Sequence, residues 1–252
     1  MVKIIAPFLI KGTIGDMNFV VTADGNNYAR LRREPPVSSL EFRTNPKYEC
    51  IRNHGKEFGQ CTKKSVLFRQ LAVQFNRVAK EGSFAGRANK LLFEILQEDT
   101  SEERGKRTLS AALKTNKGKE ALVGFESNKL RALQQVLKIK EEWHQQSQTL
   151  TLTNFNPQNQ LDWPDQATQV QLTIATANWD CENETFETNY SDTIVLDKEA
   201  ATQTIKLTTV SPQAKQLHLT YLCICFAKKD TFNYKLLHRK YNTATIIAQH
   251  TP

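Results

Sequence analysis

Cys50, His54 and Cys61 offer two thiols and one imidazole within a short stretch of the sequence. Cysteine thiolate and histidine imidazole are ligands that zinc prefers in proteins. Their spacing matches no common zinc module, however, and the fourth ligand of a structural site is missing. We therefore expect a core cysteine beside a capping or surface histidine, and no bound metal.

His54 also stands three residues before Glu57, so the two side chains could face each other on one helical turn. Such a pair could act as a general acid and base, but a lone His/Glu pair is far more often a surface hydrogen bond. The sequence contains no glycine-rich phosphate loop, no Gly-x-Ser-x-Gly elbow and no His-Glu-x-x-His pair. We expect neither catalytic residues nor a cofactor, and we predict that the chain is not an enzyme.

Basic side chains with aromatic residues between them are the stronger chemical feature. Arginine can bind phosphates while aromatic rings stack on bases, so this region could bind nucleic acid. Alternatively, the charges keep the domain soluble or pair with the acidic surface of a partner protein. No helix-turn-helix, zinc-finger or RNA-recognition signature indicates a specific reader. The predicted basic surface comprises Arg30, Arg32, Arg33, Arg43, Lys63, Lys64, Arg69 and Arg77.

The first ten residues are almost entirely apolar, and Lys3 carries their only charge. They are too few for a transmembrane helix, so we predict an extended strand and no membrane insertion. Pro7 cannot donate to a strand ladder, which favours a sheet edge. Such a strand could be buried in its own subunit or add to the sheet of a neighbour, and we favour the neighbour. The predicted assembly strand comprises Ile4, Ile5, Phe8, Leu9 and Ile10.

Trp163 and Trp179 could line a sugar-binding groove on a β-sandwich. A packed sandwich core explains at least Trp179 equally well. Both interpretations remain open from the sequence.

The five cysteines are an odd number without regular spacing, which makes a poor disulfide framework. Cys223 and Cys225 alternate with Leu222, Ile224 and Phe226, as thiols on one face of a buried strand would. A reducing compartment such as the cytoplasm is therefore predicted.

Charge and glycine content divide the chain into two parts. The 252 residues include 34 Lys and Arg against 26 Asp and Glu, a net charge of +8. Residues 149–252 carry 8 basic and 10 acidic side chains, which leaves 26 basic and 16 acidic, a balance of +10, for residues 1–148. All ten glycines lie between Gly12 and Gly124. We predict a basic domain at 1–145 and a second domain at 146–252.

The first domain should combine a β-hairpin with helices. Asp24-Gly25 lies between two runs rich in Val, Phe, Tyr and Thr, which is a hairpin signal. Apolar residues at three- and four-residue steps predict helices over 57–80 and 87–97. Asp99 and Glu102 have the spacing of a capping box for a short helix over 102–114. Residues 129–143 fit either a helix or a helix that runs into a strand.

The second domain changes to the two-residue alternation that is typical of strands. Seven such runs in about a hundred residues indicate an antiparallel, immunoglobulin-like β-sandwich, so the fold class is α+β. The runs are 149–155, 169–177, 185–196, 203–210, 217–227, 232–237 and 243–249.

Turn and helix-start residues occur in order along both halves. They are Gly12-Thr-Ile-Gly15, Asp24-Gly25, Arg30, Arg43-Thr-Asn, Ile51-Arg-Asn-His-Gly-Lys-Glu57-Phe58-Gly59, Glu98-Asp-Thr-Ser, Arg104-Gly105, Gly124-Phe-Glu-Ser-Asn128, Asn154-Phe-Asn-Pro157, Pro164-Asp-Gln-Ala167-Thr168 and Asn242-Thr-Ala. This pattern resembles a family of uncharacterised two-domain proteins found in Bacteroidota genomes. The resemblance implies a shared fold and a bacterial, cytoplasmically made protein, and brings no known activity. The sequence departs from the family at Gln60-Cys-Thr-Lys-Lys-Ser, where the family is richer in alanine and glycine.

Two functions follow as hypotheses. The first is a non-enzymatic structural protein that assembles with copies of itself into a filament, tube or similar array, through its apolar N-terminal strand and head-to-tail contacts between oppositely charged domains. The alternative is a nucleic-acid-binding or nucleoid-associated protein that acts through the basic N-terminal domain.

Overall fold

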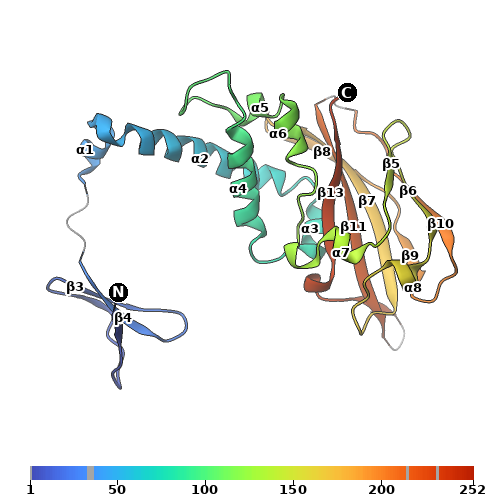
Figure 1. Cartoon of the computed structure of the whole chain (residues 1–252), viewed down its shortest axis with the longest axis horizontal. Coiled ribbons are helices and arrows are strands. Elements are labelled where there is room, and N and C mark those ends of the chain that lie inside the picture. The colour runs from blue at the N-terminus through green and yellow to red at the C-terminus, as the bar shows by residue number, and fades with distance from the viewer. Residues whose placement is uncertain (1, 33–36, 214–215, 231–232) are drawn as a thin grey trace. The chain divides into compact units, whose positions relative to one another are not determined.

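The computed structural model describes residues 2–32, 37–213, 216–230 and 233–252. The chain divides into two compact units, Met1–Cys50 and Ile51–Pro252, which we call the N-terminal unit and the main unit (Figure 1). The protein is mixed α and β, with a β-sheet and helices first and antiparallel β structure at its C-terminal end.

The N-terminal unit contains an antiparallel four-stranded sheet in the order β1-β4-β3-β2. The predicted hairpin is confirmed, because β3 and β4 pair through a turn in which Gly25 has a φ of +75°. A short helix α1 (Ser39–Thr44) and a 3-10 turn (Pro46–Tyr48) follow the sheet. The strands are β1 (Val2–Ile4), β2 (Gly12–Ile14), β3 (Met17–Val21) and β4 (Asn27–Leu31).

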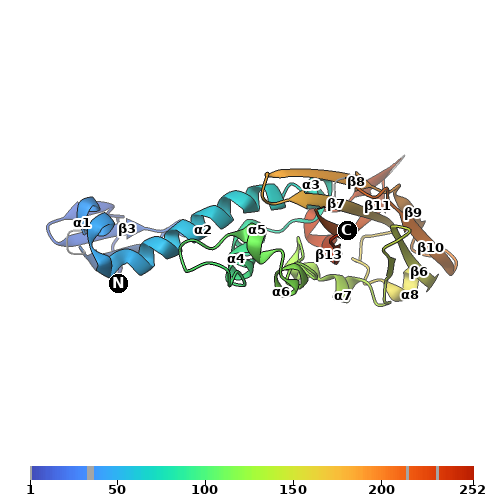
Figure 2. The same cartoon turned by 90° about the horizontal axis from the view of Figure 1, so that it is seen from above.

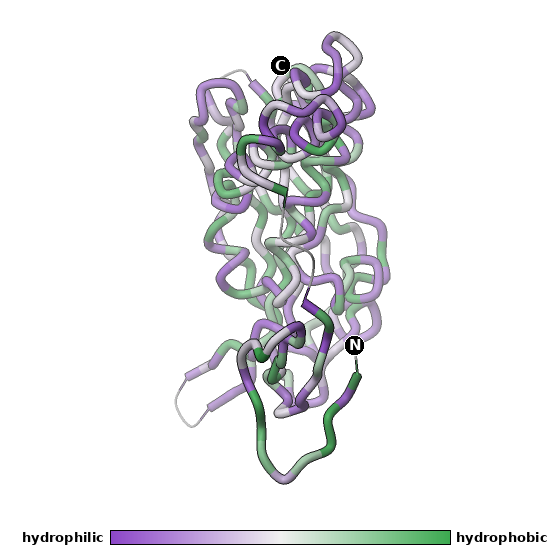
Figure 3. The backbone as a smooth tube through the Cα atoms, turned by 90° about the vertical axis from the view of Figure 1, so that its left-hand side faces the viewer, coloured by the Kyte–Doolittle hydropathy of each residue, from purple (hydrophilic) through white to green (hydrophobic). Residues whose placement is uncertain are grey.

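The predicted assembly strand is shorter than expected. Only Val2–Ile4 forms a strand, and it pairs with β4 of its own chain, with Val2 opposite Ala29. The chain bends at Pro7, which has no N–H to continue the ladder. The apolar stretch that follows the N-terminus appears in green in Figure 3.

Helices form the first part of the main unit. The amphipathic segment predicted over 57–80 is two helices, because the chain turns between Phe68 and Val73. The capping box predicted at Asp99 does not start a helix; the short helix begins after Thr108, whose side chain accepts from the N–H of Ala111. The helices are α2 (Glu49–Phe68), α3 (Val73–Ala79), α4 (Phe84–Leu96), α5 (Leu109–Ala112), α6 (Asn116–Glu120) and α7 (Leu133–Val136).

Strands form the rest of the main unit, and all of their pairings are antiparallel. A six-stranded sheet has β11 and β7 at its centre, flanked by β12 and β13 on one side and by β8 and β9 on the other. A three-stranded sheet has the order β10-β6-β5. This β structure curls into a half-barrel (Figure 1). The strands are β5 (Glu142–His144), β6 (Thr149–Phe155), β7 (Gln169–Asp180), β8 (Thr185–Tyr190), β9 (Ile194–Asp197), β10 (Gln203–Thr208), β11 (Leu217–Lys229), β12 (Tyr234–Leu236) and β13 (Thr243–His250), with a helical turn α8 (Pro157–Gln160) after β6.

Two cores lie on opposite faces of the six-stranded sheet. On one face, Tyr221, Cys223 and Cys225 of β11 pack with the helices; on the other, Leu222, Ile224 and Phe226 pack with the three-stranded sheet. We call these the helix core and the sheet core. The predicted alternation along β11 is confirmed, since both thiols are buried on the helix face.

The helix core joins residues from both sides of the predicted domain boundary. The ring centre of Phe68 of α2 lies 5.5 Å from that of Trp179 of β7, and the ring centre of Phe75 of α3 lies 5.2 Å from that of Tyr190 of β8. Figure 2 shows α3 beside the strands of the six-stranded sheet. The division into compact units falls between Cys50 and Ile51. A shared apolar core holds the helices and the sheet together.

Candidate functional site

The three potential metal ligands do not converge. Cys61 is buried and its Sγ lies 3.5 Å from the carbonyl oxygen of Leu92, whereas Cys50 is exposed. The two cysteines lie eleven residues apart on α2, a separation of about 16 Å along a helix axis. Within the described residues, no group of His, Cys, Asp and Glu side chains could hold a metal ion.

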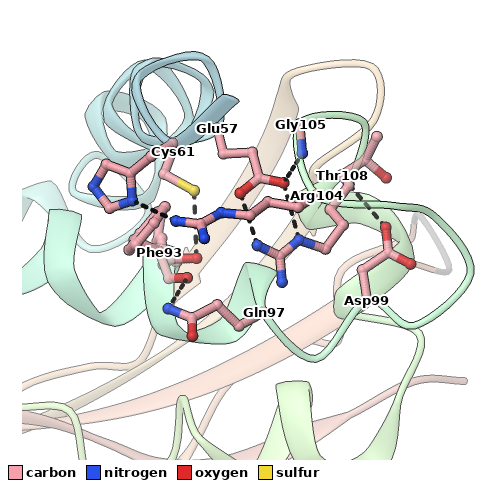
Figure 4. Close-up of polar contacts among 11 residues, drawn as sticks. Glu57, Cys61, Phe93, Gln97, Asp99, Arg104, Gly105 and Thr108 are labelled. Atoms are coloured by element: carbon pink, nitrogen blue, oxygen red, sulfur yellow. Dashed lines mark hydrogen bonds and ion pairs between the residues drawn. The ribbon is translucent and has the colours of Figure 1, made fainter. Parts of the chain in front are cut away.

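Glu57 is the centre of a buried polar network (Figure 4). Its Oε1 accepts from Arg107 Nε at 2.9 Å and from the N–H of Gly105 at 2.6 Å, and its Oε2 accepts from Arg107 Nη2 at 2.8 Å. The Arg107 hydrogen bonds lower the pKa of Glu57; burial opposes the shift, and the N–H of Gly105 supports it. The carboxylate therefore stays charged, and both of its oxygens accept hydrogen bonds from Arg107 or Gly105.

The predicted His54–Glu57 pair does not form. His54 Nδ1 instead lies 3.5 Å from Arg104 Nη2, and its ring packs 4.9 Å from that of Phe93. These side chains and Arg107 line a cavity of about 320 Å³. Hydrogen bonds from Arg107 and Gly105 hold both oxygens of Glu57, so the network attaches the segment 99–108 to α2 and Glu57 is not available as a base for His54.

Asp99 holds the segment 99–108 together through hydrogen bonds to two other residues of that segment. Its Oδ1 accepts from the N–H and Oγ of Ser101 at 2.9 and 2.6 Å, and its Oδ2 accepts from the N–H of Thr108 at 2.8 Å. The residue predicted as a helix cap thus closes a loop.

The predicted basic residues fall in both units. Arg30 lies in β4, Arg32 directly follows that strand, and Arg43 lies in α1. Arg33 lies outside the described residues. Lys63, Lys64, Arg69 and Arg77 belong to α2, the turn after it and α3 of the main unit.

Lys64 pairs with residues of its own unit and is not part of an open cationic surface. Its Nζ lies 3.0 Å from Glu184 Oε1 and donates to the carbonyl oxygen of Cys181 at 2.5 Å. These contacts tie α2 to the turn between β7 and β8.

Arg69 and Arg77 come together with Lys80, which the predicted surface did not include, around a groove of about 200 Å³. We call it the basic groove. Arg69 Nε donates to the carbonyl of Ser65 at 3.0 Å, and Asn76 Nδ2 donates to the carbonyl of Arg69 at 2.7 Å, so this arginine is held in place. No carboxylate is found among the described residues that line the groove. Its other lining residues are Val66, Gln70, Val73, Asn76 and Phe84.

The N-terminal unit carries large apolar side chains in contact with solvent. Ile5 is 95% exposed, Leu31 74% and Val2 69%. None of the described residues of this unit belongs to either core. We call this set the exposed apolar surface: Val2, Ile5, Phe8, Leu9, Ile14 and Leu31. Of the predicted assembly strand, Ile5, Phe8 and Leu9 are in this set, while Ile4 and Ile10 are half-buried.

The two tryptophans weighed as a sugar-binding pair lie in different cores. Trp179 is buried in the helix core, while Trp163 packs against the sheet core with its ring centre 5.3 Å from that of Phe226. The ring of Trp163 also lies under Lys198 Nζ, and its Nε1 donates to the carbonyl of Pro157. Because the six-stranded sheet separates them, they cannot line one groove.

Comparison with known proteins adds no family to this picture. No protein-family model, no curated protein and no solved structure matches the chain. Across the described part of the chain, even the twenty-residue α2 lacks the apolar character of a membrane-spanning helix, and the shorter helices fall below the necessary length.

Proposed function

We propose that this chain is a non-enzymatic structural protein that assembles with copies of itself into a filament, tube or similar array. The observation that carries the proposal is a four-stranded sheet whose described residues contribute to neither core and which, with the segment after β1, exposes the six side chains of the exposed apolar surface. Sheets in stable domains bury one face against a second layer. We therefore propose that another protein surface packs on the exposed apolar surface.

A second copy is the partner that we propose. Burial of one large apolar side chain contributes about 1.5–3 kcal/mol, so the six members of the exposed apolar surface could together drive association. The strands β1 and β2 lie at the two edges of the sheet, and no described strand pairs with their outer edges, so another strand can extend the sheet there. Association of one surface with a different surface of the next copy propagates unless its rotation closes a ring.

Charge supports head-to-tail contacts. Residues 1–148 carry 26 basic and 16 acidic side chains, whereas residues 149–252 carry 8 basic and 10 acidic ones. The basic half of one copy can thus face the acidic half of the next, which orients the encounter.

The test compares two charge-adding variants of the same sheet. Ile5→Lys combined with Leu31→Lys places charges on the exposed apolar surface, and Thr13→Lys adds a charge at an exposed polar position of β2. Negative-stain microscopy and light scattering should show assemblies of the natural protein and of Thr13→Lys. The double variant should be dissociated and should keep an unchanged circular dichroism spectrum. A natural protein that stays a monodisperse monomer over a wide concentration range would overturn the proposal.

The basic groove supports a second candidate, nucleic-acid binding. Arg69, Arg77 and Lys80 form a cationic cluster without a neutralising carboxylate among the described lining residues, which suits a phosphate backbone. Affinity should then fall steeply with salt, and Arg77→Gln with Lys80→Gln should reduce the slope of log affinity against log salt by about 2. Gel shifts with no retardation at about 50 mM salt would eliminate this candidate.

We also propose the finer assignment of the β structure as an immunoglobulin-like sandwich. The seven strands of such a sandwich are counted along the chain. With β8 and β9 counted as one kinked strand and β12 left out, the three-stranded sheet contains the first, second and fifth strands, β5, β6 and β10. The larger sheet then contains the third, fourth, sixth and seventh strands. In the constant-type arrangement, by contrast, the fourth strand belongs to the sheet of the first, second and fifth strands. The sheet core between the two sheets supports this assignment. A crystal structure with mean strand directions more than about 30° apart would contradict it.

A cytoplasmic location and membership of the Bacteroidota family remain proposals. The free thiols of all five cysteines support a reducing compartment. Cys223 and Cys225 approach to 3.6 Å between their sulfur atoms without a bond. Cell fractionation with an antibody to the chain tests the location, and recovery in a periplasmic or secreted fraction would contradict it.

A further inference from the structure

A cavity of about 260 Å³ lies between the α5–α6 segment and the adjacent ends of β7 and β11. Leu113 comes from the helical side, and Trp179 and Leu217 come from neighbouring strands, where they pair directly. These three side chains give the cavity an apolar wall. Its volume is just below the range of pockets for drug-sized ligands, so a smaller molecule fits it.

Trp179 supplies a hydrogen-bond donor without an acceptor. The residue is 1% exposed, and none of the described residues is a hydrogen-bond partner of its Nε1. A buried donor that stays unpaired costs about 1–3 kcal/mol, and such an atom calls for an unseen water or ligand. Trp179 is also one of the residues that line the cavity, so an acceptor atom of a bound molecule is the partner that we assign to this donor.

Two lysines stand on the helical side of the same cavity. Lys114 follows α5 and Lys119 lies in α6, and the described residues provide neither of them with an ion-pair partner. The nearby Lys117 differs, because it pairs with Glu98 at 3.8 Å. The free ammonium groups favour an anion at this side.

The acidic residues of the lining do not neutralise these lysines. The Asp180 carboxylate accepts from the N–H of Glu182 at 3.0 Å and from the N–H and Nδ2 of Asn183, both at 2.8 Å, so it closes the turn after β7. Glu182 is exposed and forms no ion pair with either lysine in the described part of the chain.

We propose that this cavity binds a small apolar carboxylic acid, with its hydrocarbon part against Leu113 and Leu217, an acceptor oxygen on the Nε1–H of Trp179, and its negative charge near Lys114 and Lys119. The site is independent of the exposed apolar surface and of the basic groove, since it shares no residue with either.

Three matched amphiphiles test the proposal on the full-length protein: octanoate, octanol and octylamine. Titration calorimetry should show octanoate binding at least about tenfold more tightly than the other two, since only octanoate gains from both lysines. Lys114→Gln with Lys119→Gln should remove this preference, and Lys117→Gln should keep it. Trp179→Phe should lower the affinity for octanoate about fivefold, which is the effect of one lost hydrogen bond. Trp163→Phe in the sheet core should leave this affinity unchanged.

The location of the ligand is tested separately with a diazirine-labelled octanoate and peptide mapping. Label on peptides that contain residues 110–119 or 179–182, displaced by unlabelled octanoate, would support the site. Label confined to the N-terminal unit, equal affinity for the three amphiphiles, or no measurable binding would overturn it. If Trp179→Phe fails to fold, the lysine pair and its Lys117 control decide the question.

Discussion

Arg107 Nη2 lies 2.8 Å from Glu57 Oε2, and the two residues are fifty positions apart in the chain. The Glu57 side chain is fully buried, so its charge depends on this partner and on the N–H of Gly105. The ion pair fixes the segment 99–108 against α2, beside the helix core.

Removal of the guanidinium should strongly destabilise the protein. Arg107→Met leaves a buried carboxylate without its main partner, and we expect the free energy of unfolding to fall by about 3 kcal/mol. Urea denaturation followed by circular dichroism measures this loss. The matched control is Lys90→Met, which breaks the exposed pair with Glu94 and should cost less than about 0.5 kcal/mol. Equal losses in the two variants would contradict the role assigned to Arg107.

The same pair predicts how stability depends on pH. The pKa of Glu57 is lower in the folded than in the unfolded protein, so folding favours the ionised form. This contribution is complete above the ordinary glutamate pKa of about 4.3 and is lost as the pH falls toward the lower folded value. The free energy of unfolding should decrease as the pH is lowered from 7 to 3. Glu57→Gln should make this decrease smaller. An unchanged slope in Glu57→Gln would contradict the prediction.

Gly105 should not tolerate a side chain. Its φ is +97°, and an added Cβ would lie 2.5 Å from Cγ of Asn53. We expect Gly105→Ala to destabilise the protein by more than about 1 kcal/mol, because both backbone strain and a clash arise. Gly86 lies inside α4 with open space around it, so Gly86→Ala should stabilise by about 0.5–1 kcal/mol. Thermal unfolding of the two variants should therefore shift in opposite directions.

Thiol labelling should distinguish Cys50 from the other four cysteines. Cys50 is exposed, whereas burial raises the pKa of Cys61 to about 12 and that of Cys181 to about 11. Cys223 and Cys225 are buried in the helix core. With a chromogenic disulfide reagent we expect one fast thiol in the native protein, five in denaturant, and none fast in Cys50→Ser. Rapid reaction of Cys223 and Cys225 would mean that the face of β11 is accessible.

The sequence predicted the local elements well. Alternating residues located β6 (Thr149–Phe155) at its observed bounds, and Asp24-Gly25 correctly indicated the hairpin of β3 and β4. The segment 129–143 proved to be a helix that runs into a strand, one of the two options left open. Residue periodicity reports such elements because each depends on neighbours a few positions away.

The candidate sites were less predictable. Lys80 joins Arg69 and Arg77 only because the chain turns between α2 and α3, and the 57–80 periodicity concealed that turn. The cavity brings residues near 114 to residues near 180, and no short-range spacing carries this information. A possible signal was Lys114 and Lys119 beside apolar Leu113, but lysines next to leucine are common on helices.

The sequence by itself determined which faces of each strand and helix are apolar, which turns require glycine, and how charge is divided between the two halves of the chain. The tertiary structure decided that Glu57 is neutralised by Arg107 and is no partner of His54, that Trp163 and Trp179 lie in separate cores, and that the helices share a core with β7 and β11. The reason is physical. Periodicity states only that an apolar face must be buried, whereas the choice of its partner depends on packing between residues that lie far apart in the chain.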